Sequence, residues 1–369
     1  MRRLVAVDLP GGGEFVDALR RAWDAGDAVL PVDQRLPPQA KRELLERLDA
    51  GVVVSTDGTE VDVAGGRPIE DGDALVVATS GSTGEPKGVV LTHDAVAASA
   101  EATSRRLGVR ADDHWLACLP LSHVGGLSVV TRALHTGTAL TVLPGFDAET
   151  VEASSATLVS LVPTALARID PAGFRAIVLG GSRPPGELPP NVVTTYGMTE
   201  TGSGVVYDGV PLDGVEVRID DGQIMLRGPM LLRCYRDGAV PLDADGWLAT
   251  GDAGELDADG RLVVHGRRDD PIITGGENVW PEPVEAVLRT VAGVADVAVA
   301  GTPDEEWGEV VTAYVVPSDP ADPVGLEVLR SAVKEVLPAF AAPRRLVLVD
   351  ALSRTSIGKL RRATLRHLT

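Results

Sequence analysis

Short runs of β-branched and other aliphatic residues alternate with helix-like segments over the first half of the chain. Helical composition occurs at 39–50 and at 93–107, where Asp94 is well placed near a helix start. Alternation of this kind predicts helices layered on a sheet, so the expected fold class is α/β. The strand-like runs lie at 4–9, 51–56, 74–80, 139–145, 156–163 and 175–181.

The sequence pattern changes twice further along the chain. From about residue 210, short strands separated by Gly/Asp turns predict a β-rich subdomain. After 266–270 the pattern becomes that of a small α+β domain, with helices expected at 282–291 and 325–337 and strands at 294–300, 310–316 and 344–350. The chain has 369 residues, whereas a single hydrophobic core usually stops growing at ~250–300 residues. We therefore expect a large domain at 1–268 and a small C-terminal domain at 269–369.

Composition excludes several classes of function. A net charge of −19 disfavours a nucleic acid partner, because no Lys/Arg cluster is large enough to reverse it over a groove-sized surface. No run approaches the ~18 apolar residues of a membrane span, so we expect neither membrane insertion nor export. The two cysteines, Cys118 and Cys234, argue against a disulfide framework or a structural zinc site. A cytoplasmic location fits this composition.

The loop from Thr79 to Gly88 reads TSGSTGEPKG and follows a strand-like run. Its glycines let backbone N–H groups converge on an anion, its hydroxyls donate to phosphate oxygens, and Lys87 adds a positive charge. The pattern favours a loop that binds a triphosphate over a plain surface loop. It is not a P-loop, since Pro86 and Gly88 flank the lysine. The segment 180–186 does not follow G-x-G-x-x-G, so it gives no Rossmann fingerprint.

This loop resembles the signature of the adenylate-forming superfamily, which holds acyl-CoA synthetases, peptide-synthetase adenylation domains and luciferases. The resemblance covers residues 74–362 and implies a large N-terminal domain of α/β layers with a β-rich subdomain, followed by a small mobile α+β domain. It also implies a ligase that uses ATP, Mg²⁺ and coenzyme A. Further matches come in the family's order: LPLSHVGG (119–126), YGMTE (196–200), LRGPM (226–230), TGD (250–252), GR (266–267) with GGE (275–277), and SIGK (356–359).

The resemblance assigns one set of residues to the nucleotide. Thr199 would contact the α-phosphate, and Glu200 would hold Mg²⁺, a hard cation that prefers oxygen ligands. Read alone, Glu200 could be a helix-start carboxylate and TGD a simple turn. The β,γ-phosphates would be bound by Thr79, Ser80, Gly81, Ser82, Thr83, Gly84 and Lys87. Adenine and ribose would be bound by Gly180, Gly181, Ser182, Tyr196, Gly197, Asp252 and Arg267.

Lys359 is the expected catalytic residue, together with Thr199 and Glu200. A cation that bridges the attacking carboxylate and the α-phosphate lowers the barrier by electrostatics and positioning. Lys359 could instead belong to a solvated basic tail with its neighbouring arginines. In the family the small domain rotates about a hinge, here Asp269. Gly275 and Gly276 would let the backbone approach the narrow channel for the pantetheine of CoA, or they could simply make a turn.

The front of the large domain is abbreviated relative to what is usual in the superfamily, and short chains of this design resemble o-succinylbenzoate:CoA ligases of menaquinone biosynthesis. A second carboxyl group and a keto group on that acid require a cationic or hydrogen-bonding pocket. Candidates are His123, Gly125, Ser128 and Arg132, of which the His and Arg could also be purely structural.

Alternatives remain open at this point. The acid could be another aryl or fatty acid, the acceptor could be a carrier-protein thiol, and a non-catalytic scaffold could retain the fold. An amino-acid-activating domain is disfavoured, because 121–135 holds no carboxylate to grip an ammonium group. The oligomeric state is open, with a homodimer among the states allowed.

Overall fold

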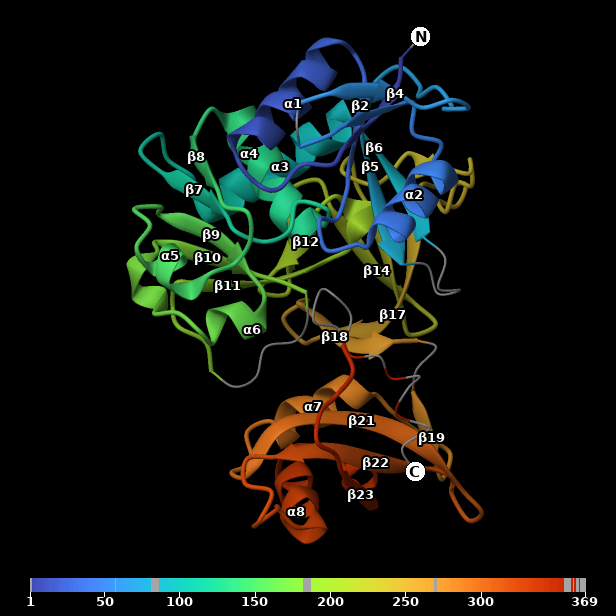
Figure 1. The fold of residues 1–369 in the computed structure, drawn as a ribbon. Helices are drawn as coiled ribbons and strands as arrows, with labels where there is room; N and C mark the ends of the chain where they lie inside the picture. Colours follow the sequence, from blue (N-terminus) through green and yellow to red (C-terminus); the bar gives the residue numbers. More distant parts are fainter. Residues whose placement is uncertain are drawn as a thin grey trace. The chain divides into compact units, whose positions relative to one another are not determined.

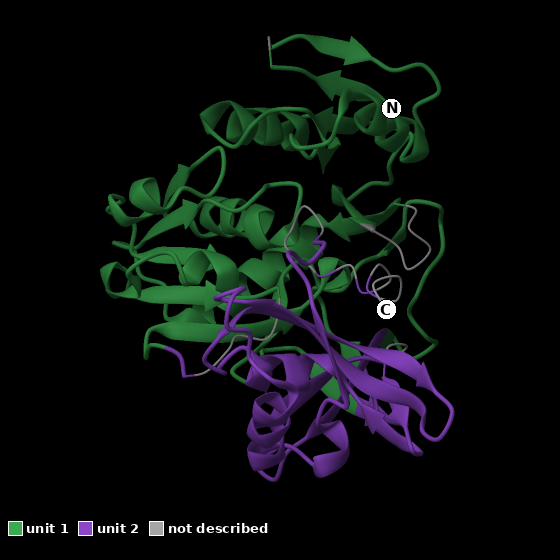
Figure 2. Ribbon diagram, turned by 60° about the horizontal axis from the view of Figure 1, so that its bottom comes forward, with its two compact units in different colours: residues 1–181, 189–218, 225–249 green, residues 182–188, 219–224, 250–369 purple. Residues whose placement is uncertain are grey.

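The computed structural model describes residues 2–56, 58–80, 86–181, 187–268 and 271–354 together with 360, 362 and 365, with the backbone alone at Ser80. Residue contacts divide the chain into two units, which are coloured in Figure 2. The expected boundary at Asp269 lies outside the described residues and stays a prediction. Unit 1 comprises 1–181, 189–218 and 225–249, and unit 2 comprises 182–188, 219–224 and 250–369.

The first sheet of unit 1 is built around buried parallel strands (Figure 1). Strand β1 (Leu4–Val7) pairs in parallel with β2 (Ala28–Pro31) and β3 (Val52–Val54). Helix α1 (Gly13–Asp24) connects β1 to β2, and α2 (Pro38–Arg47) connects β2 to β3. The strand order is β16-β6-β5-β2-β1-β3-β4, where β4 is Glu60–Asp62, β5 is Asp73–Ser80, β6 is Pro86–Thr92 and β16 is Cys234–Tyr235.

The second sheet of unit 1 has a parallel centre, which brings the carboxyl ends of its strands to one edge. Its order is β13-β12-β11-β10-β9-β7-β8. The bounds are β7 His114–Ala117, β8 Ala139–Val142, β9 Leu158–Leu161, β10 Ala176–Leu179, β11 Val192–Gly197, β12 Gly204–Tyr207 and β13 Val210–Pro211. The short helices near it are α5 (Ala148–Glu152), α6 (Pro163–Leu166), η1 (Pro171–Gly173) and η2 (Thr199–Thr201).

Two longer helices, α3 (His93–Leu107) and α4 (Val124–Thr136), pack against each other in unit 1. Helix α3 begins where the Thr92 side chain accepts a hydrogen bond from the Ala95 backbone N–H at 3.1 Å, and it ends at Gly108 in the left-handed region. Its bounds match the predicted 93–107. Helix α4 was not predicted, because its start contains two glycines and β-branched residues follow.

The third and fourth sheets are smaller. The third has the order β14-β15-β17-β18. Its bounds are β14 Glu216–Asp220, β15 Gln223–Arg227, β17 Leu248–Leu256 and β18 Leu262–Arg267. The fourth has the order β20-β19-β22-β21 with β23 beside β22, and the bounds in chain order are β19 Ile272–Thr274, β20 Glu277–Val279, β21 Val294–Asp304, β22 Gly308–Pro317 and β23 Arg345–Leu348. The helices α7 (Pro281–Leu288) and α8 (Leu326–Val336) and the turn η3 (Ala339–Ala341) accompany it.

Unit 2 has an aliphatic core of its own. Val297 and Val299 of β21, Val311 of β22 and Leu288 of α7 are fully buried in one cluster, and Leu329 of α8 completes it. The pattern of α7, β21, β22, α8 and β23 matches the predicted small α+β domain, and the predicted α/β class of the chain is confirmed. Among the described helices, none is long and apolar enough to cross a membrane.

A buried ion pair in unit 1 gives a testable pH dependence of stability. Asp113, which is 3% exposed, accepts hydrogen bonds from Arg175 Nε at 2.9 Å, from Thr157 Oγ1 at 2.7 Å and from the Arg110 backbone N–H at 2.8 Å. Burial alone would raise the pKa of Asp113, but these donors lower it to about 2.

Because the folded pKa of Asp113 lies below its unfolded value, its contribution is complete above about pH 4 and disappears as pH falls towards 2. We expect this carboxylate to account for about 2 kcal/mol of unfolding free energy across that interval. Urea unfolding of the wild type and of Asp113→Asn between pH 5 and pH 2 measures it. Equal losses of stability in the two proteins over that range would contradict the prediction.

Candidate active site

The predicted phosphate loop connects two antiparallel strands. Thr79, near the end of β5, pairs in register with Lys87, near the start of β6. The expected ligands Gly81, Ser82, Thr83 and Gly84, and the side chain of Ser80, lie outside what the structure describes. Strand β6 was not anticipated; it forms because Val89, Val90 and Leu91 are buried against β5, and it places the start of α3 six residues after Lys87.

Lys87 and Glu200 meet around a tyrosine that sequence analysis missed. The Lys87 Nζ lies 5.1 Å from the centre of the Tyr235 ring, and the Tyr235 hydroxyl donates to Glu200 Oε1 at 2.9 Å. Burial raises the pKa of Tyr235, and the charge of Glu200 raises it further, so the phenol stays neutral and donates. The expected phosphate-binding cation and the expected magnesium ligand are therefore close in space.

Tyr235 reaches this position through strand pairing. It pairs with Val89 of β6 across an antiparallel ladder, 146 positions away in sequence, which follows from the register Tyr235↔Val89. No motif surrounds Tyr235, so only this long-range pairing could have indicated its role. The residue is a further candidate for the site.

Thr199 and Glu200 sit in the short turn η2, directly after β11. The turn is fixed from both sides, because the Leu232 backbone N–H donates to the Glu200 carbonyl at 2.8 Å and Thr201 Oγ1 donates to the Ser203 carbonyl at 2.7 Å. Thr201 is fully buried. The backbone that carries the two predicted catalytic side chains is thus held in place by hydrogen bonds that do not involve those side chains.

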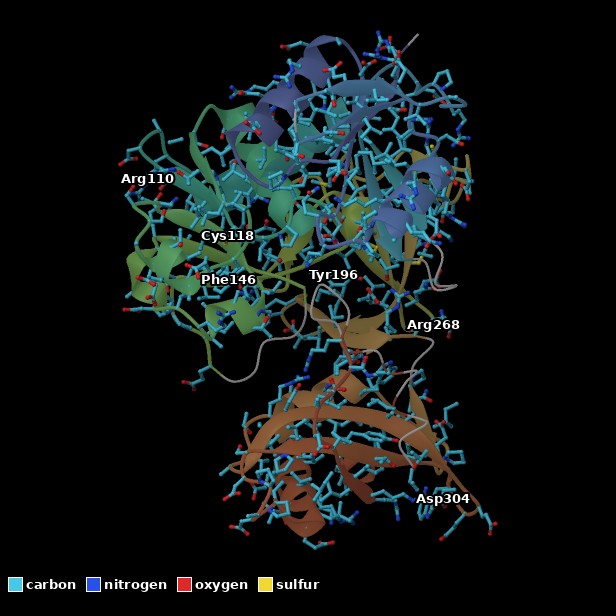
Figure 3. All side chains as sticks on the ribbon, in the orientation of Figure 1. Arg110, Cys118, Phe146, Tyr196, Arg268 and Asp304 are labelled. Atoms are coloured by element: carbon cyan, nitrogen blue, oxygen red, sulfur yellow. The ribbon has the colours of Figure 1, made fainter. Side chains whose placement is uncertain are left out.

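The predicted adenine site lies at the carboxyl edge of the second sheet. Gly180 and Gly181 follow β10, and Tyr196 and Gly197 end the neighbouring parallel strand β11; Tyr196 is labelled in Figure 3. A side chain at Gly197 would collide with the Ser203 carbonyl oxygen, so this position accepts only glycine. Ser182 lies outside the described residues. An edge of this kind is where nucleotides bind in open α/β sheets.

Asp252 and Arg267, the predicted ribose residues, are paired within unit 2. They oppose each other across β17 and β18, and Arg267 Nη1 donates to Asp252 Oδ1 at 3.1 Å and to the Thr250 carbonyl at 3.3 Å. Asp252 is 9% exposed, whereas the Arg267 side chain is half exposed. The arrangement holds a carboxylate at a fixed orientation, as hydrogen bonding to two vicinal hydroxyls requires.

The acid-site candidates lie at and along α4. His123 is the residue just before the first residue of α4, and its Nε2 lies 3.0 Å from Arg35 Nη2 and 3.7 Å from Asp33 Oδ2. Burial would raise the pKa of Asp33, but Arg35 and His123 keep it below its usual value. Sequence analysis missed Arg35 and Asp33. Gly125 lies in the first turn of the helix.

Arg132 is a buried cation. It is 2% exposed, its guanidinium lies 4.8 Å from the centre of the Trp115 ring, and Nη2 donates to Ser128 Oγ at 3.4 Å. Within the part of the chain that the structure describes, its Nε and Nη1 have no hydrogen-bond partner. Burial lowers the pKa of Arg132. Buried donors without partners are rare and costly, so this group has capacity for an acceptor that the described chain does not supply.

Gly275 and Gly276 form the two-residue turn of the β19–β20 hairpin, both with positive φ. This is the turn for which glycine is favoured in hairpins. A Cβ at Gly275 would lie 2.6 Å from the Trp307 ring. The turn fully explains both glycines, and their place in a CoA channel stays a prediction. Lys359 and Asp269 lie outside the described residues.

A magnesium ion fits the donors present in unit 1. Among the described residues, no group of three or more His, Cys, Asp or Glu side chains could enclose a metal. Mg²⁺ bound with ATP needs no such cage, because one or two carboxylates, phosphate oxygens and water complete its shell. Glu200, held by Tyr235 beside Lys87, supplies a suitable oxygen.

Comparison with known proteins agrees with this fold. The model of the AMP-binding enzyme family matches residues 64–236, and that of the AMP-binding enzyme C-terminal domain matches 283–359. The chain belongs to this family of adenylate-forming enzymes. It is 41% identical over 329 residues to the probable 2-succinylbenzoate–CoA ligase of Mycobacterium tuberculosis (strain CDC 1551 / Oshkosh), covering 81% of this chain and 85% of the relative.

Solved structures give the same result over almost the whole chain. The o-succinylbenzoate CoA synthetase of Bacillus subtilis in complex with the acyl-adenylate intermediate OSB-AMP matches with a TM-score of 0.86 and 30% identity, over 99% of this chain and 89% of that one. The same synthetase in complex with ATP and magnesium ion matches with a TM-score of 0.85 and 30% identity, over 99% and 90%.

Proposed function

We propose that this chain is an ATP-dependent acid:CoA ligase whose acid is o-succinylbenzoate. A carboxylate cannot react directly with a thiol, because the leaving group would be oxide. Its oxygen therefore attacks the α-phosphorus of ATP, pyrophosphate leaves, and an acyl-adenylate forms. The CoA thiolate then attacks the acyl carbon, and AMP leaves. The near full-length match to a synthetase solved with OSB-AMP carries this proposal.

Each group of the nucleotide is assigned to particular residues. Lys87 and the loop after Thr79 bind the β,γ-phosphates, Thr199 contacts the α-phosphate, and Asp252 accepts hydrogen bonds from the ribose. Glu200, kept in place by the Tyr235 hydroxyl, is the protein ligand for Mg²⁺. When bound, Mg²⁺ neutralises phosphate charge and favours departure of pyrophosphate. Tyr235 contributes only orientation, since its pKa is raised and it stays neutral.

Arg132 is proposed to bind the second carboxylate of the acid. Its Nε and Nη1 are buried without partners in the described chain, and each can donate a charge-assisted hydrogen bond to a carboxylate oxygen. A cation buried without an acidic partner costs folding free energy. Such a residue is expected where function needs it rather than where stability does.

Replacement of Arg132 by methionine should separate a role in binding the acid from a role in stabilising the fold. We expect KM for o-succinylbenzoate to rise about 10- to 100-fold, since a hydrogen bond to a charged group contributes about 1.5–3 kcal/mol. The melting temperature should be unchanged or higher, because the variant no longer buries a charge. Steady-state kinetics and thermal unfolding measure both.

The control for this variant is an analogue of the acid in which the second carboxyl group is replaced by hydrogen. Wild type should use the analogue poorly, and Arg132→Met should use both acids about equally. If the variant loses activity equally with both acids, or if its melting temperature falls by several degrees, Arg132 is a structural residue.

The overall reaction is tested by pyrophosphate release with o-succinylbenzoate, substituted benzoates and fatty acids of several lengths, followed by thioester analysis with CoA and with a carrier-protein thiol. We expect release with o-succinylbenzoate and a CoA thioester as product. Preference for another acid would replace the substrate assignment and leave the reaction class intact.

A cytoplasmic location and a homodimer stay predictions. Cys118 and Cys234 are free thiols and buried, as a reducing compartment allows.

A further inference from the structure

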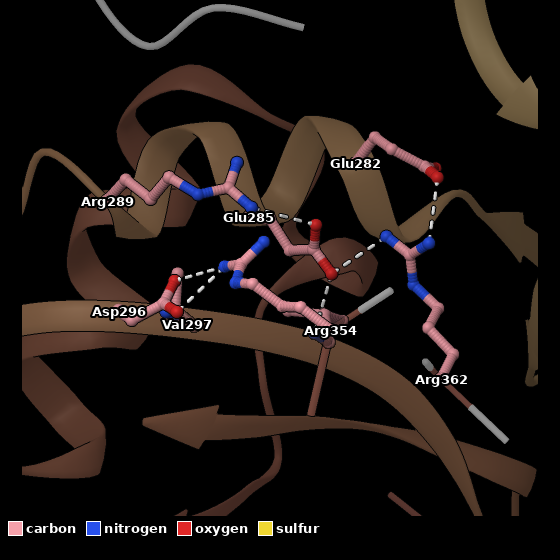
Figure 4. Close-up of polar contacts among 8 residues, drawn as sticks. Glu282, Glu285, Arg289, Asp296, Val297, Arg354 and Arg362 are labelled. Atoms are coloured by element: carbon pink, nitrogen blue, oxygen red, sulfur yellow. Dashed lines mark hydrogen bonds and ion pairs between the residues drawn. The ribbon is translucent and has the colours of Figure 1, made fainter. Parts of the chain in front are cut away.

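Two arginines flank the segment that carries Lys359, and both are anchored in unit 2 (Figure 4). Arg354 Nη2 donates to both carboxylate oxygens of Asp296 at 2.7 Å. Arg362 Nη2 donates to Glu285 Oε1 at 2.8 Å, and its Nη1 lies 3.0 Å from Glu282 Oε1. The chain is therefore tied to β21 five residues before Lys359 and to α7 three residues after it.

Glu285 is the junction of this arrangement. It is 2% exposed, and its Oε1 also accepts a hydrogen bond from the Val299 backbone N–H of β21 at 2.9 Å. Its Oε2 accepts from Arg289 Nη2 at 3.1 Å. A buried carboxylate with these three donors is firmly oriented, because each donor restricts it from a different element. Arg362 thus attaches to a rigid point of the fold.

The backbone and the apolar side chains reinforce the same attachment. Arg354 and Leu360, the described residues on either side of 355–359, pair with each other in an isolated antiparallel bridge. Leu360 packs against a buried cluster of Ala298, Ala300 and Tyr314, and Leu365 belongs to that cluster with 1% exposure. Leu360 is covalently bonded to Lys359, so the residue next to the lysine is fixed.

We propose that Arg362, through Glu285, is a positioning residue for the adenylation half-reaction. This inference rests on the role assigned to Lys359 in the proposed function. A displacement of about 1 Å in a reacting group can cost about 10²-fold in rate, so the anchoring of the residues that flank Lys359 bears on the rate of adenylation. The thioester half-reaction does not use Lys359, so release of this attachment should impair one half-reaction selectively.

Arg289 provides a matched control for simple loss of stability. It donates to the same carboxylate of Glu285 as Arg362 does, but it lies at the end of α7, 70 positions before Lys359 in the sequence. Removing either arginine leaves Glu285 with one guanidinium partner. Both variants therefore weaken the same buried carboxylate, and Arg362→Gln in addition removes the contact with Glu282 and the attachment of the residues that follow Lys359.

The experiment compares Arg362→Gln, Arg289→Gln and Arg362→Lys in the full chain. Adenylation is followed by acid-dependent ATP–pyrophosphate exchange, and thioester formation by reaction of CoA with chemically prepared acyl-adenylate. We expect Arg362→Gln to lose about 10- to 100-fold in exchange and to keep thioester formation within about threefold. Arg289→Gln should keep both rates near wild type, and Arg362→Lys should recover part of the exchange.

Equal losses in both half-reactions, an unchanged exchange rate in Arg362→Gln, or the same exchange defect in Arg289→Gln would each overturn the proposal. If Arg362→Gln does not fold by circular dichroism, Arg354→Gln, which releases the other end of the segment, replaces it with the same expectation. Exchange is measured with whichever acid the wild type activates. If the wild type does not activate o-succinylbenzoate but activates another acid, the proposed substrate is wrong. The role of Arg362 is then still tested by exchange with that other acid.

Discussion

Replacement of Lys359 by alanine should lower the rate of adenylate formation by roughly 10²–10³-fold. The reacting carboxylate and the α-phosphate are both anionic, and one ammonium group that contacts both stabilises the charge that develops between them. Thioester formation from preformed acyl-adenylate should persist, because no second anion has to approach the phosphorus in that step. Pyrophosphate exchange and a CoA transfer assay measure the two half-reactions separately.

The matched control for this substitution is Lys334→Ala. Lys334 is an exposed lysine in the last turn of α8, in the same small domain. It should leave both half-reactions unchanged. Loss of both half-reactions to the same extent in folded Lys359→Ala would remove the assignment of Lys359 to adenylation.

Replacement of Glu200 by glutamine should reduce adenylation by about 10²–10³-fold, since several kcal/mol of transition-state stabilisation depend on the metal and Glu200 is its proposed protein ligand. Glutamine keeps an oxygen that can accept the hydrogen bond from Tyr235, so the side chain can stay in position while its charge is lost. The Mg²⁺ concentration required for half-maximal exchange should rise. Exchange kinetics over a magnesium titration measure both effects.

Tyr235→Phe separates charge from orientation at the same contact. It keeps the Glu200 carboxylate and removes only the hydroxyl that donates to it, so we expect a smaller loss, about 10-fold. If Tyr235→Phe is as impaired as Glu200→Gln, the hydrogen bond rather than the charge is the essential element. If Glu200→Gln keeps its magnesium dependence, Glu200 is not the metal ligand.

Local sequence determined part of the fold well. The bounds of α3 could be predicted because Thr92, Asp94 and Gly108 act within one turn of the helix ends. Helix α4 could not, because its glycines and β-branched residues have low helix propensity and burial of its inner face outweighs that propensity. Propensity is a weak guide where tertiary packing decides the structure.

The residues of the candidate site, too, could be selected from the sequence only in part. Residues within ordered motifs, such as Thr199, Glu200 and Asp252, could be selected from the sequence. Tyr235 could not, because its contact with Glu200 depends on the pairing of β16 with β6. The attachment of Arg362 to Glu285 likewise joins positions 77 apart in the chain. Contacts of this range are set by topology and have no local pattern.

The position of Arg132 has an evolutionary consequence. An apolar residue there should not weaken the fold, so drift away from a dicarboxylic acid meets no resistance from folding. If Arg132 binds the second carboxylate of the acid as proposed, only selection for activity with that acid retains the arginine. Laboratory evolution towards acids with a single carboxyl group could therefore begin at this codon without a prior stabilising change elsewhere in the protein.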